Sequence, residues 1–166
     1  MASFTVKGPF DVPAPKHAVA RHISAEEGKQ FWGEHPDLAD ECGCYLFAFR
    51  ASQGYKPIYV GKATKSFSQE VFASHKLDKY NQGLVSIKKG TPVLFFVSLD
   101  KTRGRINESA IDEVESFLIQ SGIVANKSLL NSRKTKVESW SISGVVRAGA
   151  GQPSDAAKEL CQCLKL

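Results

Sequence analysis

Short apolar runs separated by polar stretches predict several strands in this chain. The run GCYLFAFRA at 43–51 is too short for a typical helix and long enough for a buried strand. A turn at 52–54 leads into KPIYVG at 56–61, which we interpret as the returning strand of an antiparallel hairpin. TPVLFFVSL at 91–99 is the clearest strand in the sequence, and VESWSISGVV at 137–146 alternates like a further strand.

The N-terminal region begins without a clear periodic pattern. Residues 1–20 mix three prolines with polar residues, which favours an extended arm lying on the surface. A capping box then runs from Ser24 to Glu27, and it predicts a helix that continues to about His35 and ends at Pro36.

Three more segments have helical spacing. Residues 66–80 predict a helix with one aromatic face, and residues 108–121 predict another that Asn107 caps and Gly122 ends. The tail from Ser154 predicts a last helix. We expect the core face of the second of these helices to consist of Ile111, Val114, Phe117 and Leu118.

The order of these elements predicts an α+β fold. Strands and helices recur without a parallel β-α-β rhythm, which favours a small antiparallel sheet, a core hairpin plus a further strand, flanked by helices. The 166 residues are enough for one domain with a hydrophobic core. We expect 1–42 to form the arm and capped helix, 43–131 the core, and 132–166 a strand and helix that extend the same domain.

The composition adds a charge and a cellular setting. Twenty-two Lys and Arg residues against seventeen Asp and Glu give a net charge of +5, which favours polyanionic partners without requiring them. No window approaches the roughly eighteen consecutive apolar residues of a membrane span, and the first residues lack the apolar core of a signal peptide. We therefore expect a cytoplasmic protein with no membrane partner.

The four cysteines form two pairs, Cys42 with Cys44 and Cys161 with Cys163. In a helix, positions i and i+2 point in widely separated directions, so the second pair would chelate a metal poorly. This spacing favours buried or free intracellular thiols over a zinc site.

Several short motifs follow one another in a fixed order along the chain. The predicted hairpin carries Gly43-Cys44-Tyr45 on one strand and Tyr59-Val60-Gly61 on the other. A helix with His75, a third strand and a helix with Glu115-Ser116-Phe117-Leu118-Ile119 follow in order. Together with the closing Leu129-Leu130-Asn131, these motifs resemble the GIY-YIG nuclease family over about 43–131. The stretch YVGKA is especially similar to the N-terminal domain of the bacterial excision-repair nuclease.

The resemblance implies metal-assisted hydrolysis of DNA phosphodiester bonds. By this likeness, Tyr45 is the general base or its relay, Glu115 holds Mg²⁺ or Mn²⁺, and His75 is a second candidate for proton transfer. Tyr59 is expected to lie beside Tyr45 and contact the phosphate or the attacking water. Because a free phenol titrates near ~10, Tyr45 would need nearby cations to act at neutral pH.

A second group of residues is expected to bind the phosphate backbone. Gly61 would let the backbone turn tightly where a side chain would crowd the substrate. Lys62, Lys65 and Lys76 would supply positive charge, and Asn131 matches the asparagine that closes the family's domain. No base-reading pattern accompanies them, so no sequence specificity is predicted.

One departure from the family leaves alternatives open. The family has an arginine on the helix after the second motif, but this chain has none between Arg50 and Arg103. A lysine donates from a point charge and does not reproduce the bidentate guanidinium. The alternatives are a nucleic-acid-binding module with impaired catalysis and a protein-interaction domain in which Tyr45 and Tyr59 only pack across the hairpin. Glu115 would then belong to an acidic helix face with Glu108 and Asp112.

Overall fold

The computed structural model describes residues 2–17, 20–52, 54–87, 89–100, 106–136, 142–145 and 152–164. The chain divides into two compact units, Met1–Thr135 and Lys136–Leu166, and each is described by itself. The C-terminal segment that we expected to extend the core domain therefore forms a unit of its own from residue 136 onward.

The first unit is built on a four-stranded antiparallel sheet, which confirms the predicted α+β class. The predicted hairpin is present, and its register places Tyr45 opposite Gly61 and Phe47 opposite Tyr59, with a bulge just after Phe47. In spatial order the strands are β1 (Phe4–Asp11), β6 (Thr91–Leu99), β4 (Gly43–Ala51) and β5 (Gly54–Ala63). β4 pairs with β6 as well as with β5, so β4 is a central strand and β5 lies at one edge.

The N-terminal segment is not a surface arm, as the sequence suggested, but the other edge strand of this sheet. β1 pairs with β6 from Phe4 opposite Leu99 to Asp11 opposite Val93. The ring of Phe10 enters the core and lies 6.0 Å from that of Phe96, measured between ring centroids. Pro9 hid this strand, because the ladder shifts register between Lys7 and Phe10, where a missing N–H costs no hydrogen bond. A small hairpin follows, formed by β2 (Lys16–His17) and β3 (Ala20–Arg21).

The first predicted helix is confirmed with its capping box. Ser24 caps α1 (Ala25–Glu34), and the Glu27 carboxylate accepts a hydrogen bond from the Ser24 backbone N–H at 2.8 Å. Pro36 then begins the short helix α2 (Pro36–Ala39). The helix expected at 66–80 is instead two helices, α3 (Phe67–Glu70) and α4 (Ser74–Ser86).

The break between α3 and α4 has a visible cause. The Tyr80 hydroxyl, which is fully buried, donates a hydrogen bond to the Val71 carbonyl at 2.7 Å. Phe72 packs edge-on against Trp32 of α1, with ring centroids 5.8 Å apart. These tertiary contacts hold residues 71–73 out of the helix, and the periodic pattern alone gives no sign of them.

α5 (Glu108–Ala125) begins where predicted, with Asn107 accepting a hydrogen bond from the Ala110 N–H at 3.0 Å. The helix does not end at Gly122 as predicted but continues to its C-cap at Asn126. Gly122 instead packs against Leu129. The buried stripe of α5 is Ile111, Ile119 and Gly122. Of the expected core face, Ile111 is buried and Leu118 packs against the core, but Phe117, which we also placed there, is 67% exposed.

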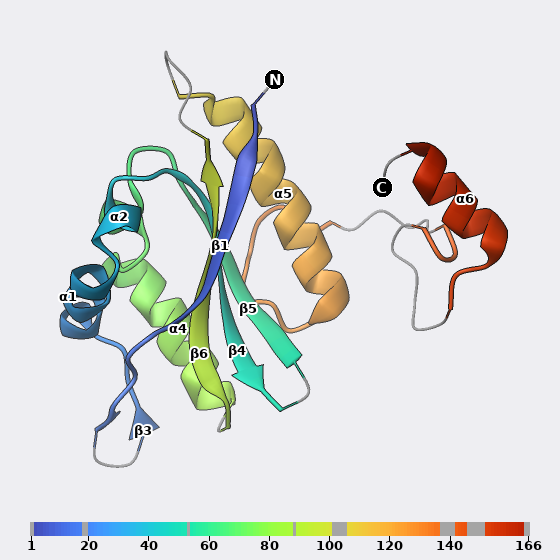
Figure 1. Ribbon diagram of the computed structural model, residues 1–166. Coiled ribbons are helices and arrows are strands. Elements are labelled where there is room, and N and C mark those ends of the chain that lie inside the picture. The colour runs from blue at the N-terminus through green and yellow to red at the C-terminus, as the bar shows by residue number, and fades with distance from the viewer. Residues whose placement is uncertain are drawn as a thin grey trace. The chain divides into compact units, whose positions relative to one another are not determined.

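The sheet separates two hydrophobic cores (Figure 1). On the side of α1 and α4 lies an aromatic core that includes Phe31, Tyr45, Phe47, Tyr80 and Phe96. On the side of α5 lies a smaller aliphatic core. Its members are Leu46, Val60, Leu118, Ile119, Ile123 and Leu129.

The second unit contains the helix predicted at the C-terminus, α6 (Asp155–Leu164), which confirms that prediction. Ala157 is its buried residue and packs close to Gly144 in the turn at 142–145. Most of the strand predicted at 137–146 lies outside the described residues. Across the described parts of both units, no helix combines the length and the apolar character needed to cross a membrane.

Candidate functional site

A polar cleft of about 610 Å³ lies along β5, an edge strand of the sheet. α4 contributes residues to one side of it and α5 to the other, and the segment after α5 completes it. The lining residues are Tyr59, Lys62, His75, Lys76, Lys79, Asp112, Glu115, Ile119, Leu130, Asn131, Ser132, Arg133 and Lys134. The cleft thus gathers six of the nine predicted site residues.

The segment after α5 is fastened to the free edge of β5. The Leu130 N–H donates to the Ile58 carbonyl at 2.8 Å. The Asn131 side chain then bonds the backbone of Val60 twice: its Oδ1 accepts from the N–H at 2.9 Å and its Nδ2 donates to the carbonyl at 2.8 Å. Asn131 therefore holds the cleft wall in place, and the second N–H of its Nδ2 is the donor that remains for the phosphate contact we predicted.

Two carboxylates of α5 meet two lysines in the cleft. Asp112 and Glu115 lie three residues apart and so project from neighbouring positions on the helix. Lys134 Nζ lies 2.6 Å from Asp112 Oδ1 and 2.8 Å from Glu115 Oε2. Lys62 forms a close ion pair with Asp112, and its Nζ is 3.6 Å from Glu115 Oε2. We call these four residues the ionic cluster.

The ionic cluster shifts the protonation of its members toward the charged forms. Hydrogen bonds from Lys134 and Lys62 lower the pKa of Asp112 to about 2. The hydrogen bond to Asp112 raises the pKa of Lys62. Partial burial lowers the pKa of Lys134, but hydrogen bonds to Asp112 and Glu115 outweigh it and raise that pKa overall. Asp112, Lys62 and Lys134 therefore favour their charged forms.

Lys134 has an unusual backbone for a residue with a side chain. Its φ is 59°, in the left-handed region, where a Cβ costs about 1–2 kcal/mol. Glu115, for its part, lies on the inward stripe of α5 between Ile111 and Ile119, and its side chain is only 14% exposed. The fold thus holds a carboxylate and an ammonium together at the point where the aliphatic core gives way to the cleft.

The α4 side of the cleft carries charge that is not neutralised. Lys76 Nζ donates to the Tyr59 hydroxyl oxygen at 3.0 Å and lies 5.3 Å from the centroid of that ring. His75 is exposed on the first turn of α4. Within the described residues, Lys79 and Arg133 form no ion pair. This side of the cleft is therefore open to an anion.

Tyr45 lies outside the cleft, contrary to our expectation that it would transfer protons. Its side chain is fully buried, and no described group forms a hydrogen bond with its hydroxyl. Burial first, and then the neighbouring Tyr80 and Tyr59, raise the pKa of Tyr45 well above its ordinary value. A phenol that is closed off from water and held neutral is not placed to accept a proton from a water molecule in the cleft.

Gly61 also has a different role from the one we expected. It lies within β5 opposite Tyr45 and forms no turn. A Cβ at residue 61 would overlap the Tyr45 phenol ring and hydroxyl, so the missing side chain makes room for that ring. Lys65 is exposed after the end of β5 and does not line the cleft.

Sequence reasoning missed one contributor to the cleft, Asp112. It did suggest that the basic residues Arg133 and Lys134 extend the positive charge along a sugar-phosphate backbone. Asp112 was interpreted only as part of a solvated acidic face, although its i, i+3 spacing to Glu115 was a usable signal. Arg133 and Lys134 come from beyond the segment with family resemblance. Arg133 supplies the cleft with a guanidinium that the helix after the second motif lacks, and only the fold brings it there.

The oxygen atoms of the ionic cluster suit a hard cation. Asp112 and Glu115 offer carboxylate oxygens, the ligands that Mg²⁺ and Mn²⁺ prefer. The ammonium groups of Lys62 and Lys134 lie against these oxygens, where a metal ion would otherwise bind. Among the described residues, no three or more His, Cys, Asp or Glu side chains gather into a metal-binding group. A divalent cation here would therefore have two protein carboxylates at most and take its other ligands from water or substrate.

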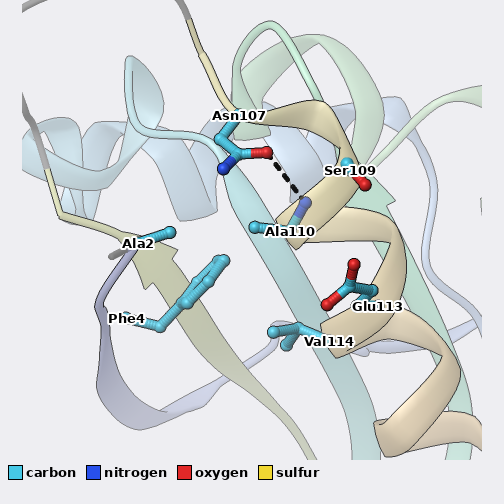
Figure 2. Close-up of a pocket in the computed structure, with 7 residues that line it drawn as sticks. All are labelled: Ala2, Phe4, Asn107, Ser109, Ala110, Glu113 and Val114. Carbon is cyan, nitrogen blue, oxygen red and sulfur yellow. Dashed lines mark hydrogen bonds between the residues drawn. The ribbon is translucent and has the colours of Figure 1, made fainter.

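A second hollow, of about 480 Å³, lies between the start of β1 and the start of α5 (Figure 2). Figure 2 shows Phe4 and Val114 on its apolar side, with the Asn107 cap at one end. Among the described residues that line it, Glu113 is the one with a charge.

Comparisons of the chain with protein-family models, with curated proteins and with solved structures gave no match.

Proposed function

We propose that the cleft binds the sugar-phosphate backbone of a nucleic acid, with DNA as the expected substrate, and hydrolyses a phosphodiester bond with the help of a divalent cation. The observation that carries this proposal is the convergence of Tyr59, Lys62, His75, Lys76 and Glu115 in one cleft. These residues come from three separate segments, and each had been assigned to phosphodiester chemistry by its place in the sequence pattern.

The charge of the cleft supports an anionic substrate. Five lining residues are Lys or Arg and two are carboxylates, which leaves an excess of three positive charges. The carboxylates are already paired with Lys62 and Lys134. The positive charge open to a ligand therefore comes from Lys76, Lys79 and Arg133, and such contacts with phosphates should weaken steeply as salt increases.

Glu115, assisted by Asp112, is the residue placed to hold the divalent cation, which when bound neutralises charge on the phosphate and activates a water molecule. Lys76 donates to the Tyr59 oxygen, so the phenolic proton is directed elsewhere and is available to a phosphate oxygen. His75 is exposed at the same cleft, and an imidazole can both accept and donate a proton. In this arrangement Tyr59 positions the phosphate and His75 transfers the proton.

The test is cleavage of supercoiled plasmid and of single-stranded and branched DNA, with Mg²⁺ or Mn²⁺, by the native protein and two matched variants. Glu115→Gln removes the carboxylate in the cleft. Glu113→Gln removes one from the same helix that faces the other hollow. We expect Glu115→Gln to lose cleavage by on the order of 100-fold and Glu113→Gln to retain it. Equal cleavage by both variants, or none by the native protein, would overturn the proposal.

A second candidate is a binding module that does not cleave. It is favoured by the lysines held against Asp112 and Glu115 and by the burial of Tyr45. This candidate predicts salt-sensitive binding of the same DNA without cleavage at any metal concentration. It also predicts that Lys79→Ala weakens binding and lowers the slope of log K against log salt by about 1, whereas Glu115→Gln leaves binding intact.

A further inference from the structure

Lys134 is held against α5 by a complete set of acceptors. An ammonium group has three N–H donors. The Lys134 Nζ has three oxygen neighbours on α5: Asp112 Oδ1 at 2.6 Å, Glu115 Oε2 at 2.8 Å and the Asp112 carbonyl oxygen at 3.2 Å. The left-handed backbone of Lys134 is unfavourable, so the surrounding contacts must stabilise it. The three bonds to α5 are the contacts placed to do so.

The oxygens that hold this ammonium are those that a divalent cation would need. Two carboxylates and a backbone carbonyl are typical ligands of a hard cation. A second positive charge placed within a few ångströms of the first is strongly repelled, and Lys62 adds a further ammonium 3.6 Å from Glu115. The free protein should therefore bind a divalent cation weakly at Glu115, even though the ligands are in place.

A phosphate in the cleft changes this balance. Lys62, Lys134 and the open cations Lys76, Lys79 and Arg133 all line the same cleft. A phosphodiester bound there offers Lys134 and Lys62 anionic oxygens in exchange for those of Asp112 and Glu115. Once the ammonium groups turn to the phosphate, the carboxylates are released to a divalent cation.

We propose that Lys134 is a positioning residue that occupies the cation position beside Glu115 in the free protein, so that a divalent cation and the phosphate backbone bind to the cleft cooperatively. This inference rests on the proposed function. Because linkage is reciprocal, a nucleic acid must raise the affinity for the cation by the same factor by which the cation raises the affinity for the nucleic acid. As a consequence of such coupling, the cleft would bind the divalent cation tightly only when the nucleic acid is also bound.

The first experiment measures Mn²⁺ binding to the full chain without nucleic acid, from the electron paramagnetic resonance signal of free Mn²⁺. Lys134→Gln should bind Mn²⁺ at least about tenfold more tightly than the native protein, because a like charge has been removed. Lys134→Arg, which keeps the charge, should resemble the native protein. Adding Glu115→Gln to Lys134→Gln should abolish the gain, which would locate the ion at Glu115.

A second variant guards against a folding defect. Lys134→Gly also removes the ammonium, and glycine adopts the left-handed backbone without strain. Both neutral variants should bind Mn²⁺ more tightly than the native protein. If neither binds more tightly while their circular dichroism matches that of the native protein, Lys134 does not compete with the cation and the inference is wrong.

The coupling is tested by repeating the titration with a short thymidine oligonucleotide, after subtraction of the Mn²⁺ bound by the oligonucleotide alone. The oligonucleotide should raise the Mn²⁺ affinity of the native protein several-fold and that of Lys134→Gln much less. Equal enhancement in both proteins would overturn the inference. If plasmid is cleaved but the variants bind Mn²⁺ no more tightly than the native protein, only this inference is refuted. If the variants bind Mn²⁺ more tightly but plasmid is not cleaved, the proposed nuclease activity is refuted and the competition between Lys134 and the cation still holds.

Discussion

The aromatic core and the cleft share one hairpin, but they place its two tyrosines in opposite environments. Tyr45 lies opposite Gly61, which has no side chain, so the phenol ring packs against the backbone of β5 and is fully buried. Tyr59 faces Phe47 and lies near the sheet edge, where Lys76 reaches its hydroxyl. The two rings are 6.5 Å apart between centroids. The same residue type is thus buried in the core or placed in the lining of the cleft according to what lies opposite it.

The substitution Gly61→Ala tests this difference between the two tyrosines with the largest expected effect. The new methyl group would overlap the Tyr45 phenol, which has no free space because it is fully buried. We expect the free energy of unfolding to fall by about 3 kcal/mol, the cost of forcing a packed ring to move. Equilibrium denaturation in urea measures this loss.

Gly33→Ala is the matched control for that experiment. Gly33 lies within α1, and a Cβ there would meet nothing within 4 Å. Because alanine favours a helix more than glycine does, this variant should gain up to about 1 kcal/mol of stability. If Gly61→Ala were as stable as Gly33→Ala, the Tyr45 ring could not be packed where we describe it.

A smaller effect is expected where the cleft wall meets β5. Asn131→Ala removes both side-chain hydrogen bonds to Val60, and it should lower the free energy of unfolding by about 2 kcal/mol. Asn107→Ala, which removes one bond at the start of α5, should cost about 1 kcal/mol. Hydrogen exchange adds a local readout: the Val60 amide should exchange faster in Asn131→Ala only. Unchanged exchange at Val60 would contradict the role given to Asn131.

The smallest effect concerns acid stability. The pKa of Asp112 is lowered to about 2 in the folded protein, against 3.8 for a free Asp carboxyl group. A lowered pKa stabilises the fold above the unfolded value, and that contribution is lost as the pH falls from about 4 toward 2. Because Asp112 is 48% exposed, the contribution is modest.

Asp112→Asn tests this point. The melting temperature of the variant should approach that of the native protein as the pH falls from 5 to about 2, because both then lack the carboxylate charge. Scanning calorimetry at several pH values gives the comparison. A constant difference over this range would show that Asp112 contributes nothing through its charge.

Local signals in the sequence were enough for much of the fold. The Ser24 capping box, the hairpin at 43–61 and the strand at 91–99 are each encoded by neighbouring residues, and all three are present. β1 was missed because its pairing with β6 is a contact over about ninety residues, for which its prolines give no local indication. The break at 71–73 was missed for a similar reason, since Tyr80 and Trp32 cause it from a distance.

The candidate site was predictable in its members more than in their roles. Glu115, His75 and Lys76 could be selected from motif order and helical spacing, and the cleft brings them together. The roles of Gly61 and Asn131 depend on the register of β5 and on the path of the chain after α5, which no local pattern specifies. The pairing of Lys134 with Glu115 depends on both.

The Asn131 contact also has a consequence for how copies of this protein behave toward one another. An open edge of a β-sheet invites a strand from another molecule to add to it, which is a common start of aggregation. Asn131 and Leu130 occupy the hydrogen-bonding groups of Val60 and Ile58 on the β5 edge. At the opposite edge, the register of β1 shifts around Pro9, and a proline offers no N–H to a partner. The wall of the cleft therefore helps to keep the sheet from growing beyond its own chain.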